Sequence, residues 1–521
     1  MNEFWGLSNP LPVGNNDIQV VLQNQGTNLL TSATIYWQVN GIAQTPIVWN
    51  GYLAEKEDTI ITIGSYNFPA GKSYQLKAWT ADPNTLTDCN TYNDTINVFD
   101  LATPLCGVYT IGGVNPDFPT FYDASVALNN AGVACPVIFK VRNGSYNEQI
   151  KLYDIPGASL ANTVLFEGEN ADSTLAEIHY QLSNPSNDFT ISLTGADYIT
   201  FQKMGIRRTN GTYALLIQNN AHHVTAQNCR LGNVISPNTS CDSVLTFRYN
   251  NLQGFDIILQ HPDAGPKANA ITVENNFLNS LVVNNSSDVS VRNNRNNITT
   301  TSYAVDFTID KSRNILVENN RMRRLYMTQD TTISVLSNNI YESSSCCNDI
   351  RGILVNESLN ASISANTILN YNYGQSRGID ILNSKSVNII NNSISVRNNQ
   401  TCCGYWAMGV YINGGNTRNV TVRNNTILSN TATIGYGIYM DAGDSIFIKN
   451  NTLSQAANPT SGTGISCYNI LSTLEVDSNT ITGYLNEGIR SRPTTGSNWK
   501  IRYNTITNIQ DAGIFGDVDV S

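Results

Sequence analysis

Apolar and polar residues alternate in short stretches that recur along most of the chain. Residues 418–428 read Arg-Asn-Val-Thr-Val-Arg-Asn-Asn-Thr-Ile-Leu, so two β-branched residues alternate with polar ones ahead of an Asn pair. Residues 387–394, 446–453 and 501–506 repeat this phrase, and its Asn can be followed back to Asn251. The interval is about 25 residues, which is typical of stacked structural repeats rather than of one closed core.

A second phrase, Gly-Ile and the residues after it, keeps step with the first. It begins at Gly352, Gly378, Gly409, Gly437, Gly464, Gly488 and Gly513. Period-2 alternation turns Ile, Val, Leu, Met and Cys to one side of these short strands. Such strands bury little alone, but stacked in register about 4.8 Å apart they form long parallel sheets around one apolar interior. The sequence therefore predicts a solenoid with several strands in each coil.

The Asn pair suits a sharp turn between two sheets. Asn tolerates the left-handed backbone conformation better than other non-Gly residues, and its amide both donates and accepts hydrogen bonds. We expect these amides to stack and bond coil to coil, in a ladder of Asn276, Asn320, Asn339, Asn366, Asn392, Asn425, Asn451, Asn479 and Asn504. Over residues 105–521 the repeat resembles the asparagine ladder of right-handed parallel β-helices, the pectin-lyase-like fold.

Residues 1–100 do not share the repeat. Strands are expected at 17–22, 33–39, 59–63 and 74–79, and turn signals such as Asn40-Gly41 separate them, which indicates a β-sandwich of immunoglobulin type. The order Val-x-Leu-x-Asn-x-Gly-Thr, Trp-x-Val-Asn-Gly, Ala-Gly-x-Ser-Tyr-x-Leu-x-Ala-Trp resembles cell-adhesion-related domains of bacterial surface proteins. The acidic, Asn-rich stretch from Asp82 to Asp94 is a candidate Ca²⁺ site, against the alternative of solvated turns.

Residues 101–150 form a junction whose one helical pattern lies at 118–131. Its order, Asp-Phe-x-Thr, a helix, an apolar strand and Gly-x-Tyr-x-Glu, resembles the start of pectin methylesterases and related β-helix proteins. The resemblance implies a helix that covers the open end of the solenoid. The expected fold is all-β: an immunoglobulin-like β-sandwich at 1–100, the junction at 101–150, and a right-handed parallel β-helix solenoid at 151–521, which we expect to continue past residue 521 in a longer modular protein.

Composition narrows the location and the partners. Charged residues are only 13% of the chain, net charge is −10, and no Lys/Arg run is present, so nucleic acid is not an expected partner. No stretch approaches the roughly 18 consecutive apolar residues of a membrane helix. The N-terminus lacks a signal peptide, yet ten cysteines and a lysine-poor surface favour a secreted or cell-surface protein.

The sequence lacks the catalytic motifs of enzymes that have the β-helix fold it resembles. The Asn-Thr-Asp, Asp-Asp, Gly-His-Gly and Arg-Ile-Lys set of polygalacturonase-like hydrolases is absent, and residues 305–310 only distantly echo the Asp-Phe-x-Phe-Gly of methylesterases. A carboxylate pair among Asp380, Asp441, Asp444 and Glu357 stays open as an acid–base site, against the alternative of solvated turns. The pair His222-His223 is expected in a turn, and no metal site or other cofactor is predicted.

The cysteines predict disulfides rather than zinc, since no Cys-x₂-Cys spacing occurs. We expect bridges Cys106–Cys135, which flanks the helix, and Cys229–Cys241, which brackets a loop. The vicinal pairs Cys346-Cys347 and Cys402-Cys403 are expected to be bridged internally or to one another. Cys467 stands at an inward position and is expected to be a buried thiol.

The position after each Gly-Ile points outward and reads Leu354, Asp380, Tyr411, Tyr439, Ser466, Arg490 and Phe515. Tyr411 and Tyr439 should stack on adjacent coils, and aromatic faces beside charged groups suit a sugar ring. We hypothesise a groove for polysaccharide or cell-surface glycan formed by Asp380, Tyr411, Asn413, Tyr439, Asp441 and Arg490. The function favoured is a non-catalytic adhesin or stalk module; the alternatives are a polysaccharide lyase or hydrolase, a spacer without ligand, and aromatic pairs that only stabilise the sheet.

Overall fold

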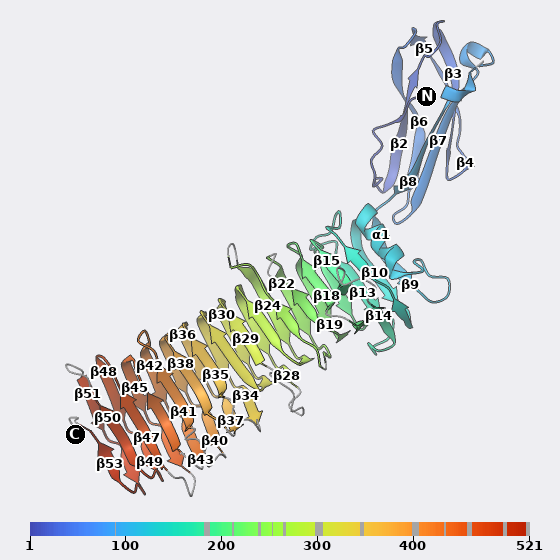
Figure 1. Ribbon diagram of the computed structural model, residues 1–521. Coiled ribbons are helices and arrows are strands. Elements are labelled where there is room, and N and C mark those ends of the chain that lie inside the picture. Colours follow the sequence, from blue (N-terminus) through green and yellow to red (C-terminus); the bar gives the residue numbers. More distant parts are fainter. Residues whose placement is uncertain are drawn as a thin grey trace. The chain divides into compact units, whose positions relative to one another are not determined.

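A computed structural model describes residues 1–88, 90–181, 188–210, 213–237, 241–252, 254–263, 267–296, 306–343, 349–372, 374–398, 406–431, 434–455, 461–492 and 498–516. These residues fall into two compact units. The first holds Met1–Ala171 and Gly195–Thr200, and the second holds Asp172–Thr194 and Phe201–Ser521. Each unit is built almost entirely of strands (Figure 1).

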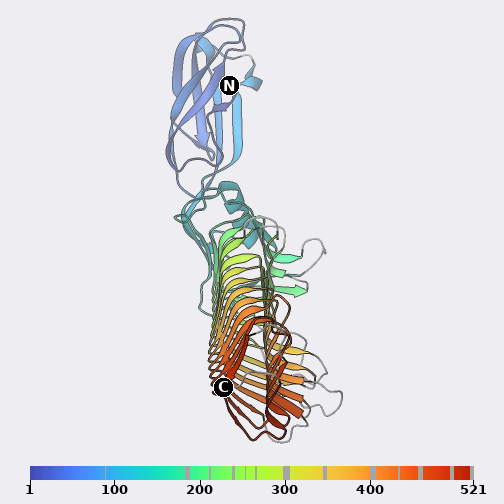
Figure 2. The ribbon, with the colours of Figure 1, turned by 90° about the vertical axis from the view of Figure 1, so that its left-hand side faces the viewer.

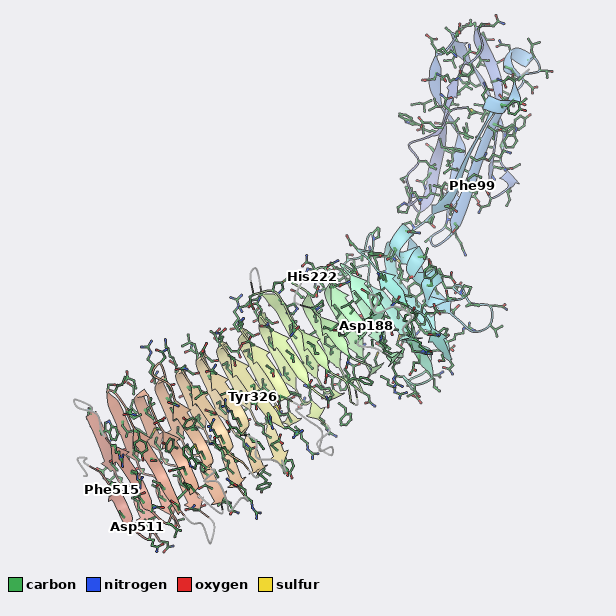
Figure 3. The ribbon with its side chains drawn as sticks, in the orientation of Figure 1. Phe99, Asp188, His222, Tyr326, Asp511 and Phe515 are labelled. Carbon is green, nitrogen blue, oxygen red and sulfur yellow. A yellow bond between two sulfur atoms is a disulfide. The ribbon has the colours of Figure 1, made fainter. Side chains whose placement is uncertain are left out.

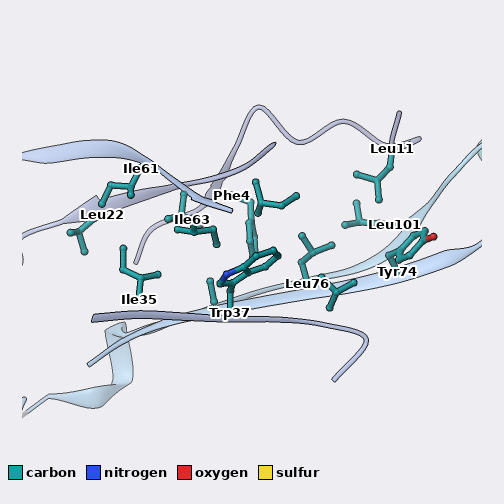
Figure 4. Close-up of a cluster of buried hydrophobic side chains, with 14 of the residues drawn as sticks. Phe4, Leu11, Leu22, Ile35, Trp37, Ile61, Ile63, Tyr74, Leu76 and Leu101 are labelled. Atoms are coloured by element: carbon teal, nitrogen blue, oxygen red, sulfur yellow. The ribbon is translucent and has the colours of Figure 1, made fainter. Parts of the chain in front are cut away.

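The first unit begins with a β-sandwich. One sheet has the order β1-β2-β6, and the other has the order β4-β3-β7-β8 with β5 on β3. The strands are β1 (Phe4–Trp5), β2 (Gly14–Gln23), β3 (Leu30–Val39), β4 (Ile42–Ala43), β5 (Ile47–Leu53), β6 (Asp58–Phe68), β7 (Ser73–Ala81) and β8 (Thr95–Ala102). Every second residue points into one core, where Trp37 lies among Ile35, Ile63 and Leu76 (Figure 4). The strands predicted at 17–22, 33–39, 59–63 and 74–79 lie within β2, β3, β6 and β7.

The proposed Ca²⁺ stretch forms two 3₁₀ turns, η1 (Pro83–Thr85) and η2 (Thr91–Asn93). Asp88 accepts a hydrogen bond from the backbone N–H of Asn90 at 2.8 Å. Burial raises the pKa of Asp94, and the nearby Asp88 acts in the same direction. Within the described residues no group of three or more His, Cys, Asp or Glu side chains is placed to hold a metal ion.

After the sandwich, the first unit continues with parallel strands and with α1 (Phe121–Ala131), which is the α-helix found among the described residues. Strands β9 (Leu105–Ile111), β10 (Val133–Val141) and β13 (Val164–Gly168) pair in parallel, and β11 (Gly144–Asn147) and β12 (Ile150–Leu152) lie between β10 and β13 in sequence. Helix α1 is N-capped by Thr120, whose hydroxyl accepts from the N–H of Asp123. Phe121 stacks on Phe166 with centroids 6.1 Å apart, so the helix covers the interior of this first coil.

A disulfide joins Cys106 to Cys135 across this junction, as expected from the sequence. It closes a separation of 29 residues, so its loss should increase the entropy of the unfolded chain. We expect the Cys106→Ala, Cys135→Ala double variant to lose about 3 kcal/mol of unfolding free energy, measured by denaturant titration without reductant. The reduced parent should match the variant; equal stability of parent and variant without reductant would contradict the prediction.

The second unit is a right-handed parallel β-helix with three sheets, stacked strand on strand (Figures 1 and 2). Sheet 1 holds the strands before the Asn turn: β19 (His222–Gln227), β22 (Ser243–Arg248), β24 (Ala268–Glu274), β27 (Ser286–Arg292), β30 (Arg313–Glu318), β33 (Thr331–Leu336), β36 (Leu359–Ser364), β39 (Lys385–Ile390), β42 (Arg418–Arg423), β45 (Asp444–Lys449), β48 (Thr473–Asp477) and β51 (Asn498–Arg502), with β16 (Ile199–Gln202) shared between the units.

Sheet 2 holds the strands after that turn: β25 (Phe277–Leu278), β28 (Arg295–Asn296), β31 (Arg321–Met322), β34 (Asn339–Ser343), β37 (Thr367–Asn372), β40 (Ser393–Asn398), β43 (Thr426–Thr431), β46 (Thr452–Gln455), β49 (Thr480–Thr482) and β52 (Thr505–Thr507). Strands β14 (Ala176–Gln181), β17 (Gly205–Asn210) and β20 (Arg230–Leu231) pair in the earlier coils.

Sheet 3 holds the Gly-Ile strands and their counterparts: β15 (Phe189–Thr194), β18 (Tyr213–Gln218), β21 (Val234–Ser236), β23 (Ile257–Leu259), β26 (Leu281–Asn284), β29 (Asp306–Asp310), β32 (Arg324–Thr328), β35 (Ile350–Asn356), β38 (Ser376–Leu382), β41 (Trp406–Asn413), β44 (Ile434–Met440), β47 (Ser461–Tyr468), β50 (Glu487–Arg492) and β53 (Ala512–Phe515). The glycines of its Gly-Ile pairs lie close to the backbone of the next coil. A Cβ on Gly378 would lie 2.5 Å from the carbonyl oxygen of Gly409, so a side chain there would force the coils apart.

The Asn turn divides two tasks between its two residues. The first residue takes the left-handed conformation, and Asn424, Ala365, Ser478 and even Tyr503 fill this place with φ of 58°, 55°, 57° and 56°. The second residue stacks. Each buried amide accepts from the backbone N–H of the preceding ladder residue, through Asn250, Asn276, Asn294, Asn320, Asn338, Asn366, Asn392, Asn425, Asn451, Asn479 and Asn504.

One predicted ladder position, Asn339, was one residue too late, and so was Asn251, the position to which the repeat was traced. Asn338 is buried in the ladder, whereas Asn339 is exposed and begins β34; likewise Asn250, not Asn251, belongs to the column. The visible Asn pairs misled the assignment because Ser337 and Tyr249 already occupy the left-handed position, with φ of 55° in both. The ladder therefore requires Asn only at its second place.

A second hydrogen-bonded column lies at the corner between sheets 3 and 1, and the sequence analysis did not foresee it. The backbone N–H of Ser286 donates to Ser312 Oγ at 3.1 Å, that of Ser312 to Asp330 Oδ1 at 2.7 Å, and that of Asp330 to Ser358 Oγ at 3.1 Å. Ser358 continues to Ser384 at 3.0 Å. As in the Asn turn, a left-handed residue precedes each member, for example Gln329 with φ 56°.

The predicted bridge Cys229–Cys241 is wrong. Cys229 is a buried thiol, and its Sγ lies 3.3 Å from the carbonyl oxygen of Gln227. Burial raises the pKa of the Cys229 thiol to about 12, and burial also raises the pKa of Cys241. Cys467 is a buried thiol at an inward position of β47, as expected. Cys346, Cys347, Cys402 and Cys403 lie outside the described residues.

Candidate functional site

The outer face of sheet 3 carries one column of side chains in strict register. The residue after each Gly-Ile pairs with its counterpart on the next coil, and the same register continues into earlier coils through Tyr326. Figure 3 labels two of its residues, Tyr326 and Phe515, which bound the part considered below. The members are Tyr326, Leu354, Asp380, Tyr411, Tyr439, Ser466, Arg490 and Phe515. We call this column with its flanking side chains the sheet-3 strip.

Five partly exposed aromatic residues gather in the strip around Tyr439. Tyr411 stacks on Tyr439 with centroids 5.8 Å apart and ring planes 29° apart. The ring centroid of Tyr439 also lies 4.8 Å from that of Tyr436, 5.7 Å from that of Tyr468 and 6.2 Å from that of Trp406. Sequence reasoning found Tyr411 and Tyr439 and missed the other three. Tyr468 keeps the outward alternation of β47, whereas Trp406 and Tyr436 lie before the Gly-Val pair of β41 and the Gly-Ile pair of β44, where the alternation shifts by one residue.

Both faces of the Tyr411 ring are occupied. The guanidinium carbon of Arg377 lies 4.7 Å from the ring centroid, and Arg377 and Tyr439 belong to β38 and β44, the two strands that flank β41. They therefore approach the ring from opposite sides. The hypothesis that a sugar stacks on the face of Tyr411 needs correction, because what remains accessible is the ring edge and its hydroxyl.

Asp380 holds arginines in place and is not presented to a ligand. Its side chain is 0% exposed, and its Oδ2 accepts from Arg377 Nη1 at 2.9 Å and pairs with Arg351 Nε at 3.2 Å. Asp349 pairs with the same two arginines at 3.4 Å and 3.2 Å. Burial raises the pKa of Asp380, and the two guanidinium groups act in the opposite direction.

Arg490 is also engaged within the protein. It forms an ion pair with Glu487, and its Nη1 donates to the hydroxyl of Tyr468 at 3.5 Å. Its guanidinium carbon lies 5.9 Å from the ring of Phe515. Arg492, which the sequence analysis did not include, lies 5.4 Å from the ring centroid of Tyr468. Arginine and aromatic side chains therefore alternate along this end of the strip.

Asn413 and Asp441 lie at the end of β41 and just after β44. Asn413 Nδ2 donates to the Tyr411 hydroxyl at 2.6 Å, and its Oδ1 accepts from the N–H of Gly414 at 2.6 Å. The Asp441 carboxylate has no bonding partner among the described residues and is partly exposed. Burial, then the charge of Asp441, raises the pKa of Tyr439. Burial likewise raises the pKa of Tyr411, so both phenols stay protonated at neutral pH.

The structure separates the four carboxylates that were candidates for an acid–base pair. Asp444 begins β45 in sheet 1 and accepts from Ser445 Oγ at 3.0 Å. Glu357 takes a left-handed turn position with φ 50° and accepts from Gln329 Nε2 at 2.8 Å. Only Asp380 and Asp441 belong to the strip. His222 accepts from the N–H of Ser243 at 3.1 Å, and His223 has φ 56°, which suits the expected turn.

A family model described as a right handed beta helix region matches residues 409–519. No curated protein matches the chain. Among solved structures, the CARDB domain of a Pyrococcus furiosus protein with di-metal ions is 22% identical, with 18% of this chain and 84% of that chain covered and a TM-score of 0.16. The A-module of the Azotobacter vinelandii mannuronan C-5 epimerase AlgE4 is 13% identical, with 77% and 96% covered and a TM-score of 0.29.

Bacteriophage CBA120 tailspike protein 3 is 12% identical, with 79% of this chain and 60% of that chain covered and a TM-score of 0.30. At such identities and scores these likenesses identify no function. The class of protein rests on the strand pairing: a right-handed parallel β-helix preceded by a β-sandwich. In the described part of the chain, no helix has the length and apolar character needed to cross a membrane.

Proposed function

We propose that the protein is a secreted, non-catalytic module that binds a polysaccharide along the sheet-3 strip. The observation that carries the proposal is the aromatic group around Tyr439, which spans three consecutive coils and remains partly exposed. A solvent-facing set of aromatic rings with polar tips suits a ligand that is apolar on its ring faces and rich in hydroxyls. The disulfide Cys106–Cys135 fits an oxidising compartment.

The column geometry suits an extended chain as ligand. Its members repeat at the strand spacing of about 4.8 Å, from β32 to β53. Such a column offers similar contacts to successive units of a repeating polymer, so affinity should rise with the length of an oligosaccharide until the strip is filled.

The pairing of the carboxylates favours binding over cleavage. A general acid or base must exchange its proton with the substrate. Asp380 and Glu342 are both 0% exposed and contact arginines: Asp380 contacts Arg351 and Arg377, and Glu342 contacts Arg323 and Arg324. Glu487 pairs with Arg490. These acids are held as structural counter-ions of the arginines.

The test is a Tyr411→Ala, Tyr439→Ala double variant in binding assays with a panel of acidic and neutral polysaccharides. We expect the variant to keep its fold and bind at least about tenfold more weakly, because contacts to the hydroxyls and accessible ring edges of the two tyrosines, roughly 1 kcal/mol each, are lost. Phe447→Ala, a partly exposed aromatic on sheet 1, is the control. Unchanged affinity of the double variant would place the site elsewhere; new reducing ends would show an enzyme, and binding to no glycan would favour a spacer.

A further inference from the structure

The charges of the sheet-3 strip from β35 to β50 cancel. Asp349 and Asp380 balance Arg351 and Arg377, and Glu487 balances Arg490. Asp380 is fully buried and Glu487 nearly so, beneath arginines that are more exposed, whereas Asp349 is more exposed than Arg351 and Arg377. The carboxylates of Asp380 and Glu487 thus neutralise Arg377 and Arg490. These two guanidinium groups also pack on the rings of Tyr411 and Phe515, so their contacts are made within the protein.

Two further charged groups belong to this part of the strip, and they have opposite signs. Arg492 packs on the ring of Tyr468, at the edge of the aromatic group. Asp441 is partly exposed and directly follows β44, two residues after Tyr439, and its charge acts on both Tyr439 and Tyr411. A carboxylate only accepts hydrogen bonds, so Asp441 requires a donor from the ligand and repels another carboxylate.

The polar groups left for a ligand are mainly those that pair with hydroxyls. Tyr436 and Tyr439 hydroxyls have no hydrogen-bond partner among the described residues, and each can both donate and accept. Burial raises the pKa of Tyr436 as well as that of Tyr439, so both keep their protons. Sugar hydroxyls can donate hydrogen bonds to these phenol oxygens and accept hydrogen bonds from them.

We propose that the ligand of the strip is an uncharged polysaccharide, with Asp441 as the residue that excludes acidic sugars. This inference rests on the proposed function. A polyanion would gain no net attraction from a strip whose charges cancel, and it would meet a chain of net charge −10. An uncharged chain avoids both costs and satisfies the hydroxyls and the Asp441 carboxylate.

The first experiment measures affinity for neutral chains (β-glucan, xylan, mannan) and acidic chains (alginate, polygalacturonate) at about 50 mM and about 500 mM NaCl. We expect binding to a neutral chain whose dissociation constant changes less than about threefold with salt, and at least about tenfold weaker binding to the acidic chains. Tight binding to an acidic chain that weakens steeply with salt would overturn the inference and leave the proposed function standing. Binding to none of them would overturn both.

The second experiment replaces Asp441 by Asn, which removes the charge and keeps the size. We expect about tenfold weaker binding to the neutral chain and a smaller ratio between neutral and acidic affinities, since the strongest acceptor and the repulsion are both lost. Asp288→Asn, an exposed residue of β27 on sheet 1, is the charge-matched control and should change neither value. If Asp441→Asn leaves affinity and ratio as in the parent, Asp441 does not select the ligand.

Discussion

Replacing Asp330 by Asn is expected to make the protein more stable at neutral pH, not less. Asp330 occupies a serine position of the second hydrogen-bonded column and is fully buried. Burial raises its pKa to about 8, with Asp310 acting in the same direction and Lys267 and the backbone bonds in the other. Its Oδ1 accepts from the N–H of Ser312, whereas Oδ2 is buried without a hydrogen-bond partner.

The sign of the pH effect follows from the two pKa values. The unfolded chain ionises Asp330 near 3.8, and the folded chain only near 8. The folded state therefore retains a proton that the unfolded state releases, and stability is lost as pH rises through this window. At about 1.4 kcal/mol per pH unit, the cost reaches about 4 kcal/mol by pH 7.

The Asp330→Asn variant carries no titratable proton at this position, so this loss disappears. The new amide would meet the geometry of the Asn ladder, where for example Asn338 Nδ2 donates to the carbonyl two residues earlier at 3.1 Å. Denaturant unfolding of parent and variant from pH 4 to pH 8 should give a stability difference that grows with pH in favour of Asp330→Asn. A difference that stays constant over this range would show that Asp330 is ionised in the folded protein.

Asp172→Asn is the control of opposite sign. Hydrogen bonds from the hydroxyl and N–H of Thr174 lower the pKa of Asp172. Its ionised form therefore stabilises the folded state above the unfolded pKa, and the variant should lose stability towards neutral pH. Comparing the pH dependence of the unfolding free energy in the parent and in the two variants separates the contribution of Asp330 from that of the other titrating groups.

Replacing Asn425 by Ala is expected to destabilise the β-helix by about 3 kcal/mol or more. The amide of Asn425 accepts from the backbone N–H of Asn392 at 2.8 Å and from Asn392 Nδ2 at 3.0 Å. It also donates to the carbonyl of Ile389 at 2.9 Å and to Asn451 Oδ1 at 2.9 Å. All three Asn residues are buried, so Ala would leave several groups without partners, at about 1–3 kcal/mol each.

Thermal unfolding and amide exchange would measure the effect, with exchange expected to rise at Asn392, whose N–H loses its acceptor. Asn424→Gly is the matched control, because Asn424 is exposed, has φ 58°, and Gly accepts that conformation. We expect the control to cost well under half as much. Equal losses in the two variants would mean that the turn conformation, not the amide ladder, stabilises this corner.

The sequence predicted the β-helix well because its repeat is local and periodic. The phrase around Asn425 specifies a strand, a left-handed residue, a buried amide and a new strand within eleven positions, and the same phrase returns coil after coil. Period-2 alternation also placed Tyr411 and Tyr439 in one column, since parallel register aligns equivalent residues. Asn suits both the left-handed turn position and the buried ladder position. The assignment therefore failed at Asn338 and Asn339, where Ser337 takes the left-handed position and Asn338 the ladder position.

The site was less predictable because side-chain contacts across coils decide it. Asp380 and Tyr411 looked alike in the sequence, as outward residues of successive Gly-Ile strands. Only the structure shows that Arg351 and Arg377 bury Asp380, while Arg377 also covers a face of Tyr411. These arginines come from positions before the glycine, so the column alone could not reveal the pairing.

By itself, the sequence determined the fold class, the stacking direction and which side chains face outward, since each follows from residue propensities and a repeat of constant phase. The tertiary structure decided which outward groups remain open, where the second column runs, and that Cys229 and Cys241 are not joined. Those outcomes depend on distances between coils, on burial and on charge balance. A charge or a thiol acquires its role from the neighbours that packing brings to it, and these lie about one coil away in the sequence.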